Sequence, residues 1–330
     1  MWYTNFGPSG DVVLSTRVRL ARNIEKIPFG IKMTSENRLK VTDNCKAALP
    51  DLKFIDLAAM SDIEKASLRE CHLISPELAE SNNNCGILVN EDCTVSVMLG
   101  EEDHIRIQAM APGLDIKKCL KTANEIDDRL EEKVDFAYDA SFGYLTCCPT
   151  NTGTGLRASV MVHLPALTES GSISSIIRSL SKLGLTVRGI YGEGSEALGN
   201  IYQISNQVTL GVSEEETVEK LEQIITELIA KERSAGLSIY ENNKFRLEDR
   251  VMRAKGLLQN AYLMTSAEAM RLISDVRWGI TLGIINNINH EQLSKALYAS
   301  LPANITKTHN TASLAERDLK RAEILRTMLS

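Results

Sequence analysis

The sequence predicts a mixed α/β domain over residues 1–240, followed by a small all-helical domain over residues 241–330. Apolar and polar residues alternate in DVVLSTRVRLA at residues 11–21, which is typical of a half-buried strand. Segments with helical periodicity are interleaved with such strands. From about residue 241 the strand-like segments end, and only helical patterns continue.

The first domain is predicted to contain further strands and helices in the following order. CGILVN-ED-CTVSVML indicates two strands around a tight turn, and HIRIQ continues extended. Apolar residues at helical spacing predict a helix over 115–134, and another helix should end before Gly184. VRGIYG and GNIYQISNQVTLG are separated by a glycine-rich turn, and Ser213 with Glu216 forms a capping box that begins a long helix. A further strand is expected at 156–165, and the helix that ends before Gly184 is expected to cover 172–183.

The second domain is predicted to be entirely helical. Helices are expected at 246–255, 266–284 and 290–299, and a last one begins at the Ser313 and Glu316 capping box. The segment SDVRWGITLGII at 274–285 is apolar on more faces than one core contact requires, which favours a homodimer.

The bulk composition limits the class of protein. The chain has 330 residues, a net charge of -6, 43% hydrophobic and 24% charged residues, which describes an ordinary globular protein and excludes a general nucleic-acid binder. No apolar run is long enough to span a membrane, and MWYTNFGPSG lacks a signal-peptide pattern. Seven cysteines without a C-x-x-C pair favour reduced thiols. We therefore expect a cytoplasmic protein.

Arginines are placed beside strands and glycine-rich turns. In STRVR, Arg17 and Arg19 point to the same face of a strand, where their planar forks suit phosphate oxygens or, alternatively, simply form a solvated edge. In EEDHIRIQ, an extended backbone puts Glu102, His104 and Arg106 on one face, as a site or as self-compensating charges.

Two glycine-rich segments add further charge. RGIYGEGSE supplies Arg188 and Glu193 between glycines that suit either a closing loop or a plain turn. CCPTNTGTGLR ends at Arg157 and lacks the lysine of the G-x-x-x-x-G-K-[ST] phosphate loop. Five arginines without such a lysine predict a triphosphate that is bound by arginine alone.

Four segments together resemble the guanidino (phosphagen) kinase family, and most closely its bacterial protein-arginine kinase branch. They are STRVRLARN, EEDHIRIQ, CPTNTGTGLRASV and VRGIYGEGSEALGNIYQISNQVTLG, and they occur in the family's order over nearly the whole chain. The resemblance implies an antiparallel sheet flanked by helices, and an α+β fold. It also implies transfer of a phosphoryl group from Mg-ATP to a guanidinium.

The resemblance assigns roles residue by residue. Glu102 is implied as the catalytic base, Glu193 as a second carboxylate that grips the guanidinium, and Cys148 as a thiolate beside it. ATP would be bound by the five arginines, with His72 near the adenine unless it is a capping or core histidine. Mg²⁺ would be bound by nucleotide and water, with Glu101 as a candidate outer-shell partner and no direct protein ligand. Cys147 stands where relatives more often carry serine or threonine. The residues implied to bind ATP are Arg17, Arg19, His72, Arg106, Arg157 and Arg188.

A second group of residues bears on the acceptor. STRVR begins at residue 15, so we expect no N-terminal domain over the acceptor side, which leaves room for an arginine on a protein surface. RDLKRA matches a phosphoarginine-binding motif of protein-arginine kinases, and Arg317 and Arg321 lie one helical turn apart. The alternative is a solvated helix face. The motif residues are Arg317, Asp318, Arg321 and Ala322.

The sequence thus predicts an enzyme that phosphorylates arginine side chains of proteins. Alternatives are a kinase for free arginine or another guanidino metabolite, and a phosphoarginine-binding protein without catalysis. The resemblance further implies marking of proteins for a Clp protease in a stress response, and a small zinc-binding activator protein as partner.

Overall fold

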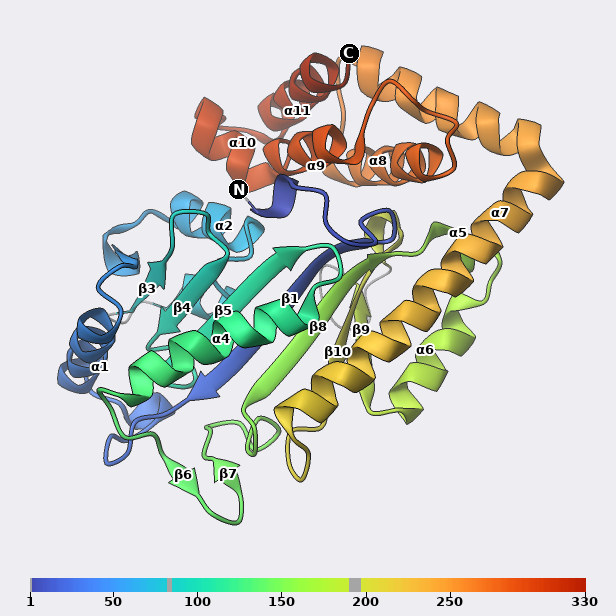
Figure 1. The fold of residues 1–330 in the computed structure, drawn as a ribbon. Coiled ribbons are helices and arrows are strands. Elements are labelled where there is room, and N and C mark those ends of the chain that lie inside the picture. The colour runs from blue at the N-terminus through green and yellow to red at the C-terminus, as the bar shows by residue number, and fades with distance from the viewer. Residues whose placement is uncertain (1, 82–84, 190–196) are drawn as a thin grey trace.

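The largest feature of the computed structural model, which describes residues 2–81, 85–189 and 197–330, is an eight-stranded sheet. Its strand order is β2-β3-β4-β5-β1-β8-β10-β9, and every neighbouring pair is antiparallel. The antiparallel sheet flanked by helices is therefore confirmed (Figure 1). Its strands are β1 (Val13–Arg22), β2 (Lys53–Asp56), β3 (Gly86–Val89), β4 (Val95–Leu99), β5 (Ile105–Pro112), β8 (Leu156–His163), β9 (Leu185–Gly189) and β10 (Ile201–Asn206).

Helices cover the apolar face of this sheet. α4 (Ile116–Glu131) and the first half of α7 (Glu214–Asn260) lie across it in Figure 1. Alternate residues such as Val18 and Leu20 of β1 point into the core beneath them, since successive strand residues face opposite sides. α1 (Ser35–Ala48) and α6 (Ile173–Lys182) extend the same core at its two ends.

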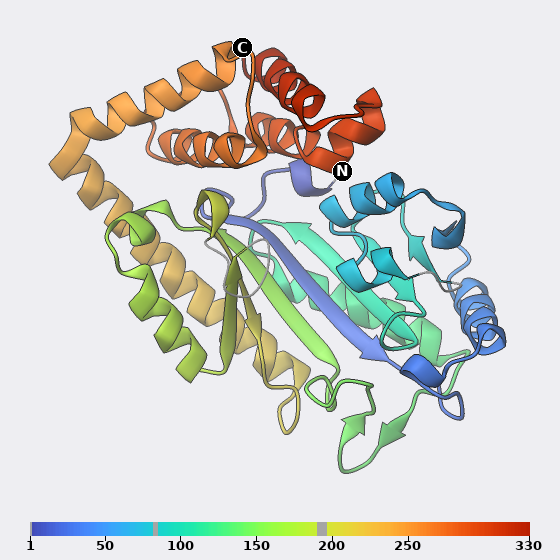
Figure 2. The same cartoon turned by 180° about the vertical axis from the view of Figure 1, so that it is seen from behind.

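The opposite face is covered only in part. α2 (Asp62–Glu70) and α3 (Pro76–Glu80) pack over β3, β4 and β5 around a second apolar cluster. Within the described residues, no helix crosses β1, β8 and β10 on this side, as Figure 2 shows from behind. Ser15, Arg17 and Arg19 of β1 therefore lie on a part of this face where there is room for polar side chains.

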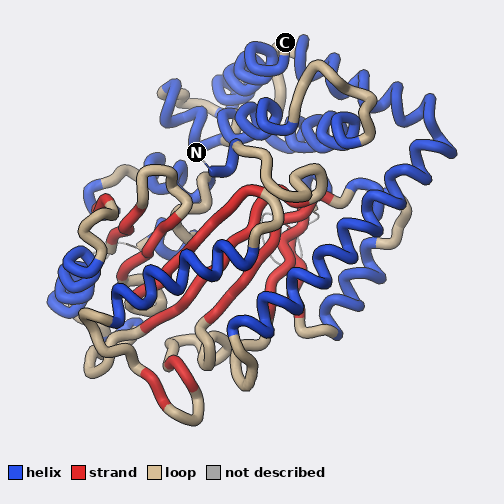
Figure 3. Tube along the Cα trace, in the orientation of Figure 1, coloured by secondary structure: helices blue, strands red, loops and turns tan. Residues whose placement is uncertain are grey.

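The helical region has its own core, next to the sheet. It contains the end of α7, α8 (Ser266–Thr281), α9 (His290–Ala299), α10 (Pro302–His309) and α11 (Leu314–Leu329). Figure 3 shows helices alone in this region. The predicted helix at 246–255 is part of α7, which continues through a non-helical Asn243. The predicted boundary after residue 240 falls just before this break.

The apolar pattern of residues 274–285 was expected to favour a homodimer, and this reason was wrong because the segment packs within the chain. Val276, Trp278 and Gly279 of α8 are buried inside the chain itself, against the core of the helical region. Gly279 allows this contact, because a Cβ there would lie 2.2 Å from Val251 Cγ1. The apolar faces of this segment are therefore used in folding.

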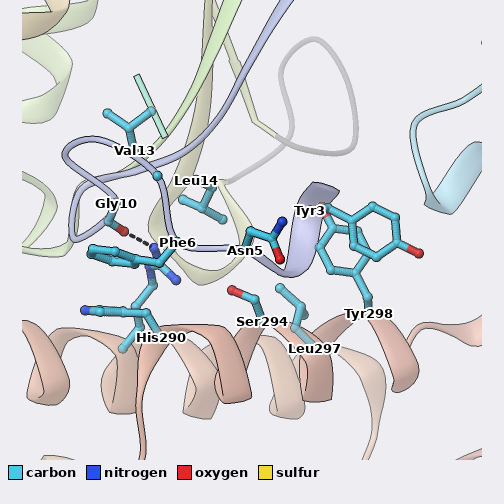
Figure 4. Close-up of a pocket in the computed structure, with 12 residues that line it drawn as sticks. Tyr3, Asn5, Phe6, Gly10, Val13, Leu14, His290, Ser294, Leu297 and Tyr298 are labelled. Carbon is cyan, nitrogen blue, oxygen red and sulfur yellow. Dashed lines mark hydrogen bonds between the residues drawn. The ribbon is translucent and has the colours of Figure 1, made fainter. Parts of the chain in front are cut away.

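The N-terminal segment lies against the helical region. Phe6 stacks on His290 with ring centroids 5.2 Å apart, and Tyr3 contacts Tyr298 at 4.0 Å (Figure 4). Arg277 of α8 donates to the carbonyl of Gly10 at 2.5 Å. These contacts, together with α10 against α2, connect the two regions.

Short elements complete the chain. They were not predicted, because elements of two to five residues carry too little periodicity to recognise. None of the described helices is long and apolar enough to cross a membrane. The short elements are α5 (Pro165–Glu169), β6 (Tyr138–Asp139), β7 (Gly143–Tyr144), and 3-10 turns at Trp2–Thr4, Gly30–Lys32, Leu57–Ala59 and Leu198–Asn200.

Candidate active site

The five predicted arginines lie on one face of the sheet. In the β-sheet register, Arg19 is directly opposite Arg157 of β8, and Ala21 on the same face is opposite Arg106 of β5. Arg17 is two residues from Arg19 on this face, and Arg188 of β9 is paired with Gln203, which accepts a bond from Arg17 at 3.2 Å. We call this set, Arg17, Arg19, Arg106, Arg157 and Arg188, the arginine face.

The charge of the arginine face is not balanced around Arg17 and Arg19. Burial, with Arg157 and Arg106 nearby, lowers the pKa of Arg17 to about 10. Burial and the neighbouring guanidiniums also hold the pKa of Arg19 well below its usual range. The Nε atoms of both are buried and have no hydrogen-bond partner among the described residues. Donors and positive charge gathered in this way are suited to an anion with several oxygens.

Carboxylates stand at one end of this face, in the turn between β4 and β5. Glu101 is buried and accepts from Arg106 at 2.5 Å, while Glu102 Oε2 lies 3.5 Å from Arg106 Nη2. The side chain of Glu102 is 45% exposed. Burial and the nearby Asp103 raise the pKa of Glu102, although Arg106 opposes this. Glu102 is therefore an accessible carboxylate next to the guanidinium cluster.

A buried polar network fixes this turn. Asn23 Nδ2 donates to Asp103 Oδ1 at 2.7 Å, and the backbone N–H of His104 donates to Asn23 Oδ1 at 2.9 Å. Ile24 N–H donates to His104 Nδ1 at 3.0 Å, so the ring proton is on Nε2 and is donated to the Pro28 carbonyl at 3.2 Å.

Sequence reasoning missed Asn23 and Asp103 as positioning residues. Asn23 directly follows β1, and the two residues lie inside the segments STRVRLARN and EEDHIRIQ, which were the signals that could have found them. His104 was placed on the exposed face of the strand with Glu102, but it is fully buried. It therefore positions the turn and does not face the site.

The two adjacent cysteines have different environments. Cys147 Sγ donates to the Glu102 carbonyl at 2.8 Å, and its backbone N–H donates to Asp103 at 2.7 Å. Burial, Asp103 and Glu102 raise the pKa of the Cys147 thiol to about 12. Cys148 Sγ lies 3.0 Å from Thr150 Oγ1. Cys147 is thus a neutral thiol that joins the cysteine loop to Glu102.

The glycines of TGTG allow close backbone packing. Gly153 has φ +118°, and a Cβ there would lie 2.1 Å from the Thr209 carbonyl oxygen; at Gly155 it would lie 2.6 Å from the Ala21 carbonyl oxygen. The turn therefore lies directly against the end of β1. Its role is to place Arg157 and the cysteine loop, which explains why no lysine follows it.

Arg22, which the sequence did not single out, fixes this turn from behind. It is 1% exposed, pairs with Asp127 at 2.7 Å and donates to the Thr154 carbonyl at 2.9 Å. Its guanidinium also lies 3.5 Å from the ring centroid of Tyr144. Arg22 is therefore structural.

His72 lies at the other end of the arginine face. It borders a small pocket with Arg17, Ser159 and Gln203, and its ring is 6.3 Å from Tyr298. Burial and the charge of Arg17 lower the pKa of His72 to about 4. The ring is neutral near pH 7. It lies at the end of the arginine face that is opposite to Glu102.

One predicted group, the RDLKRA motif, does not join this face, and one predicted residue cannot be assigned a position. Glu193 lies outside the described residues. The RDLKRA motif is on α11, where Arg321 is buried and donates to the carbonyls of Ser300 and Met264 and to Asp318 at 3.0, 2.9 and 2.5 Å. Ala322 is buried in the helical core, and Arg317 is half-buried with its Nε unpartnered among described residues.

The described residues include no group of three or more His, Cys, Asp or Glu that could hold an ion. The unpartnered Nε atoms of Arg17 and Arg19 fit phosphate oxygens instead. The residues therefore fit the phosphate groups of a nucleotide.

Comparisons with known proteins agree with this geometry. Residues 34–235 match the family model "ATP:guanido phosphotransferase, C-terminal catalytic domain", and residues 244–330 match "Protein-arginine kinase McsB C-terminal domain". A protein-arginine kinase from Halothermothrix orenii is 44% identical over 100% of this chain and 96% of its own. One from Caldanaerobacter subterraneus subsp. tengcongensis is 47% identical over 97% of each chain.

The fold is also similar to solved structures. A crystal structure of lombricine kinase has a TM-score of 0.61 and 27% identity, over 70% of this chain and 68% of that one.

Proposed function

The chain belongs to the ATP:guanido phosphotransferase family, in its protein-arginine kinase branch, and we propose that its acceptor is an arginine side chain of another protein. As a member it is an ATP-dependent phosphotransferase that uses Mg-ATP and phosphorylates arginine. The acceptor as part of a protein is the finer step, and the similarity to protein-arginine kinases over the full chain supports it.

One observation carries the mechanism: an unbalanced arginine face ends at an accessible Glu102. Arg17 and Arg19 have buried Nε donors without partners in the part of the chain that the structure describes, which suits the phosphates of ATP. Arg106, held by Glu101, is the guanidinium nearest to Glu102. The triphosphate would therefore run along the face with its γ-phosphoryl group toward Glu102, where charge developing during transfer is stabilised by fixed guanidiniums.

Glu102 would then act as the general base. It takes a proton from the acceptor guanidinium while the nitrogen forms a bond to the γ-phosphorus, and the bond from that phosphorus to the bridging oxygen of ADP breaks. We assign the second carboxylate to Glu193 by family resemblance. We assign the thiol that contacts the guanidinium to Cys148 by family resemblance. The environment of Cys147 supports this choice, because Cys147 is already bound to the Glu102 carbonyl as a neutral thiol.

The remaining assignments follow from the same placement. His72 beside Arg17 would lie at the nucleoside end of the ATP. Mg²⁺ would neutralise phosphate charge, and Glu101 would contact its water shell. Reduced thiols, with all seven cysteines free, support a cytoplasmic enzyme.

Phosphorylation assays test the proposed acceptor. The protein is incubated with Mg-ATP and either casein or free arginine, and acid-labile phosphate is measured. Transfer to casein is expected. Transfer to free arginine alone would favour the metabolite kinase, and transfer to neither would favour a phosphoarginine-binding protein.

We also propose a phosphoarginine site at RDLKRA. The Nε of Arg317, which has no hydrogen-bond partner among residues 2–81, 85–189 and 197–330, supports this proposal. Arg321 orders Asp318 and the neighbouring loops from inside. Arg317→Ala should weaken phosphoarginine binding in calorimetry, with arginine as the control ligand, and should leave thermal stability nearly unchanged. Unaltered binding would make RDLKRA a purely structural motif. Degradation by a Clp protease, a stress role and a zinc-binding activator remain family-based proposals.

A homodimer is proposed through a different surface from residues 274–285. Large apolar side chains are exposed along the second half of α7 and the loop after it, and isolated proteins rarely leave such patches uncovered. Light scattering should report a dimer that Phe245→Ser and Tyr262→Ser weaken. These side chains are Phe245, Met252, Leu257, Tyr262 and Leu263, with Phe245 84% and Tyr262 78% exposed.

A further inference from the structure

A small hairpin projects from the sheet next to the cysteine loop. It consists of β6 and β7, spans residues 138–144, and extends away from the helical region in Figure 1. Tyr138 and Phe142 are 60% and 55% exposed. We call this element the aromatic hairpin. Exposed aromatic side chains are favoured at contact surfaces, because they cover a large area and lose little conformational entropy on binding.

The aromatic hairpin is held in one conformation. Isolated two-stranded hairpins are marginal in water, so its order needs support from outside. Asp139 Oδ1 accepts from the backbone N–H groups of Ser141 and Phe142 at 2.8 and 3.1 Å, which fixes the tip. A Cβ on Gly143 would lie 2.5 Å from the Gly153 carbonyl oxygen, so the hairpin packs directly on the TGTG turn.

Its base is fixed by an aromatic contact. The ring centroids of Tyr144 and Tyr138 are 5.3 Å apart. The Cζ atom of Arg22 lies 3.5 Å from the ring centroid of Tyr144. Arg22 is itself held by Asp127. The exposed rings are therefore presented on a rigid support, which lowers the entropic cost of binding.

The hairpin is close to the acceptor end of the arginine face. The Leu145 carbonyl accepts from Asn23, which also holds Asp103 next to Glu102. Cys148 is four residues beyond Tyr144, so their Cα atoms are at most about 14 Å apart, and Tyr138 is paired with Tyr144. An extended peptide rises about 3.3 Å per residue. About four residues of a bound chain therefore bridge from Cys148 to the hairpin.

The surface beside the hairpin is acidic. Glu25 and Asp135 are exposed and joined through a backbone bond of 2.8 Å, and Glu131 and Glu132 are exposed where α4 ends. Lys26 and Lys133 offset two of these four charges. The balance attracts a cationic chain, and the aromatic rings provide apolar contact.

We propose that the aromatic hairpin binds the polypeptide segment that flanks the acceptor arginine, in an extended conformation, through Tyr138 and Phe142. The proposal rests on the proposed protein-arginine kinase function. It explains how an enzyme with a guanidinium site can favour an arginine within a chain over the free amino acid.

Peptide length provides the test. The full-length protein is assayed with Mg-ATP on a blocked Gly-Arg-Gly tripeptide and on an unstructured peptide of about 15 residues with a central arginine, long enough at about 3.3 Å per residue to reach the hairpin on either side. The variant is Tyr138→Ser/Phe142→Ser. The matched control is Leu39→Ser/Leu183→Ser, which removes two side chains of 52% and 46% exposure from α1 and from the end of α6, outside the hairpin.

Wild type and control should show a higher kcat/KM on the long peptide, and the hairpin variant should lose roughly tenfold of that value, through KM, while it keeps the tripeptide rate. Equal loss on both peptides would make the hairpin a structural element, and an unchanged preference for the long peptide would overturn the proposal. If wild type phosphorylates free arginine but neither peptide, the proposed function itself fails and the hairpin proposal with it.

Discussion

Arg19 of the sheet and Arg321 of α11 are both withdrawn from solvent, yet their environments are opposite. Arg321 is 1% exposed, and its guanidinium binds two carbonyls and the carboxylate of Asp318. Arg19 is half-buried beside Arg17 and Arg157, and its buried Nε has no partner among the described residues. One guanidinium is used by the fold, and the other keeps its donors and charge for a ligand.

This difference shows how a binding arginine can be told from a structural one. A buried guanidinium that is fully bonded stabilises the chain around it, and removing it leaves acceptors without donors. A guanidinium among others of the same charge destabilises the empty protein, and an anion relieves the repulsion. Function at the arginine face thus comes at the expense of local stability.

The largest expected effect is at Glu102, the acceptor end of the arginine face. Glu102→Gln should lower phosphoryl transfer by roughly 100- to 10,000-fold, because the acceptor nitrogen loses its base. ATP affinity should stay nearly unchanged, since the arginines remain. Steady-state kinetics and nucleotide titration measure the two quantities. Turnover close to wild type would remove Glu102 from this role.

Substitution of Arg19 and of Arg321 by methionine tests whether the first arginine binds a ligand and the second stabilises the fold. Arg321→Met should reduce the free energy of unfolding by about 3–5 kcal/mol, because Asp318 loses its buried partner. Arg19→Met should leave stability equal or higher, because repulsion decreases, and should weaken ATP binding by roughly 10- to 100-fold. Denaturant unfolding and calorimetry provide the measurements. A comparable loss of stability in both variants would contradict the distinction.

Cys147 and Cys148, at the acceptor end of the arginine face, are expected to contribute differently to catalysis. Cys148→Ser should lower kcat by on the order of tenfold, as one charge-assisted contact to the acceptor is lost. Cys147→Ser should change it little, because a hydroxyl also donates to the Glu102 carbonyl. Since the pKa of Cys147 is about 12, alkylation near pH 8 should modify Cys148 first, and substrates should protect it. Protection mapped to Cys147 would reverse the assignment.

The smallest expected effect is on the pH dependence of folding stability, through His104 in the turn that carries Glu102. Burial lowers the pKa of His104, so the folded state binds fewer protons than the unfolded state below the ordinary value of about 6.5. Stability should therefore be complete above pH 6.5 and decrease as the pH falls toward the folded pKa. His104→Asn keeps an acceptor for Ile24 N–H and removes the titration. The free energy of unfolding of this variant should depend less on pH in this range. An equal pH dependence in both proteins would exclude His104 as the source.

The sequence by itself determined the fold class and the residue types of the site. Alternation in STRVR was enough to place Arg17 and Arg19 on one face, because side chains of a strand alternate with a period of two. Long periodic segments, such as the one that became α4, were recognisable for the same local reason. Ser213 and Ser313 are the N-caps of two helices, as predicted, although the reciprocal capping box forms only at Ser213, and Glu316 accepts instead from the Ala312 N–H.

Only the tertiary structure decided which arginines share an environment. The pairing of β1 with β5 and β8 brings Arg19, Arg106 and Arg157 together from segments far apart in the sequence. It also decided that Arg321 is bonded inside the chain, that His104 is buried, and that Gly143 and Gly153 place the aromatic hairpin beside the cysteine loop. Local patterns record which side of an element a residue occupies, whereas burial, charge balance and pKa depend on neighbours that only long-range packing supplies.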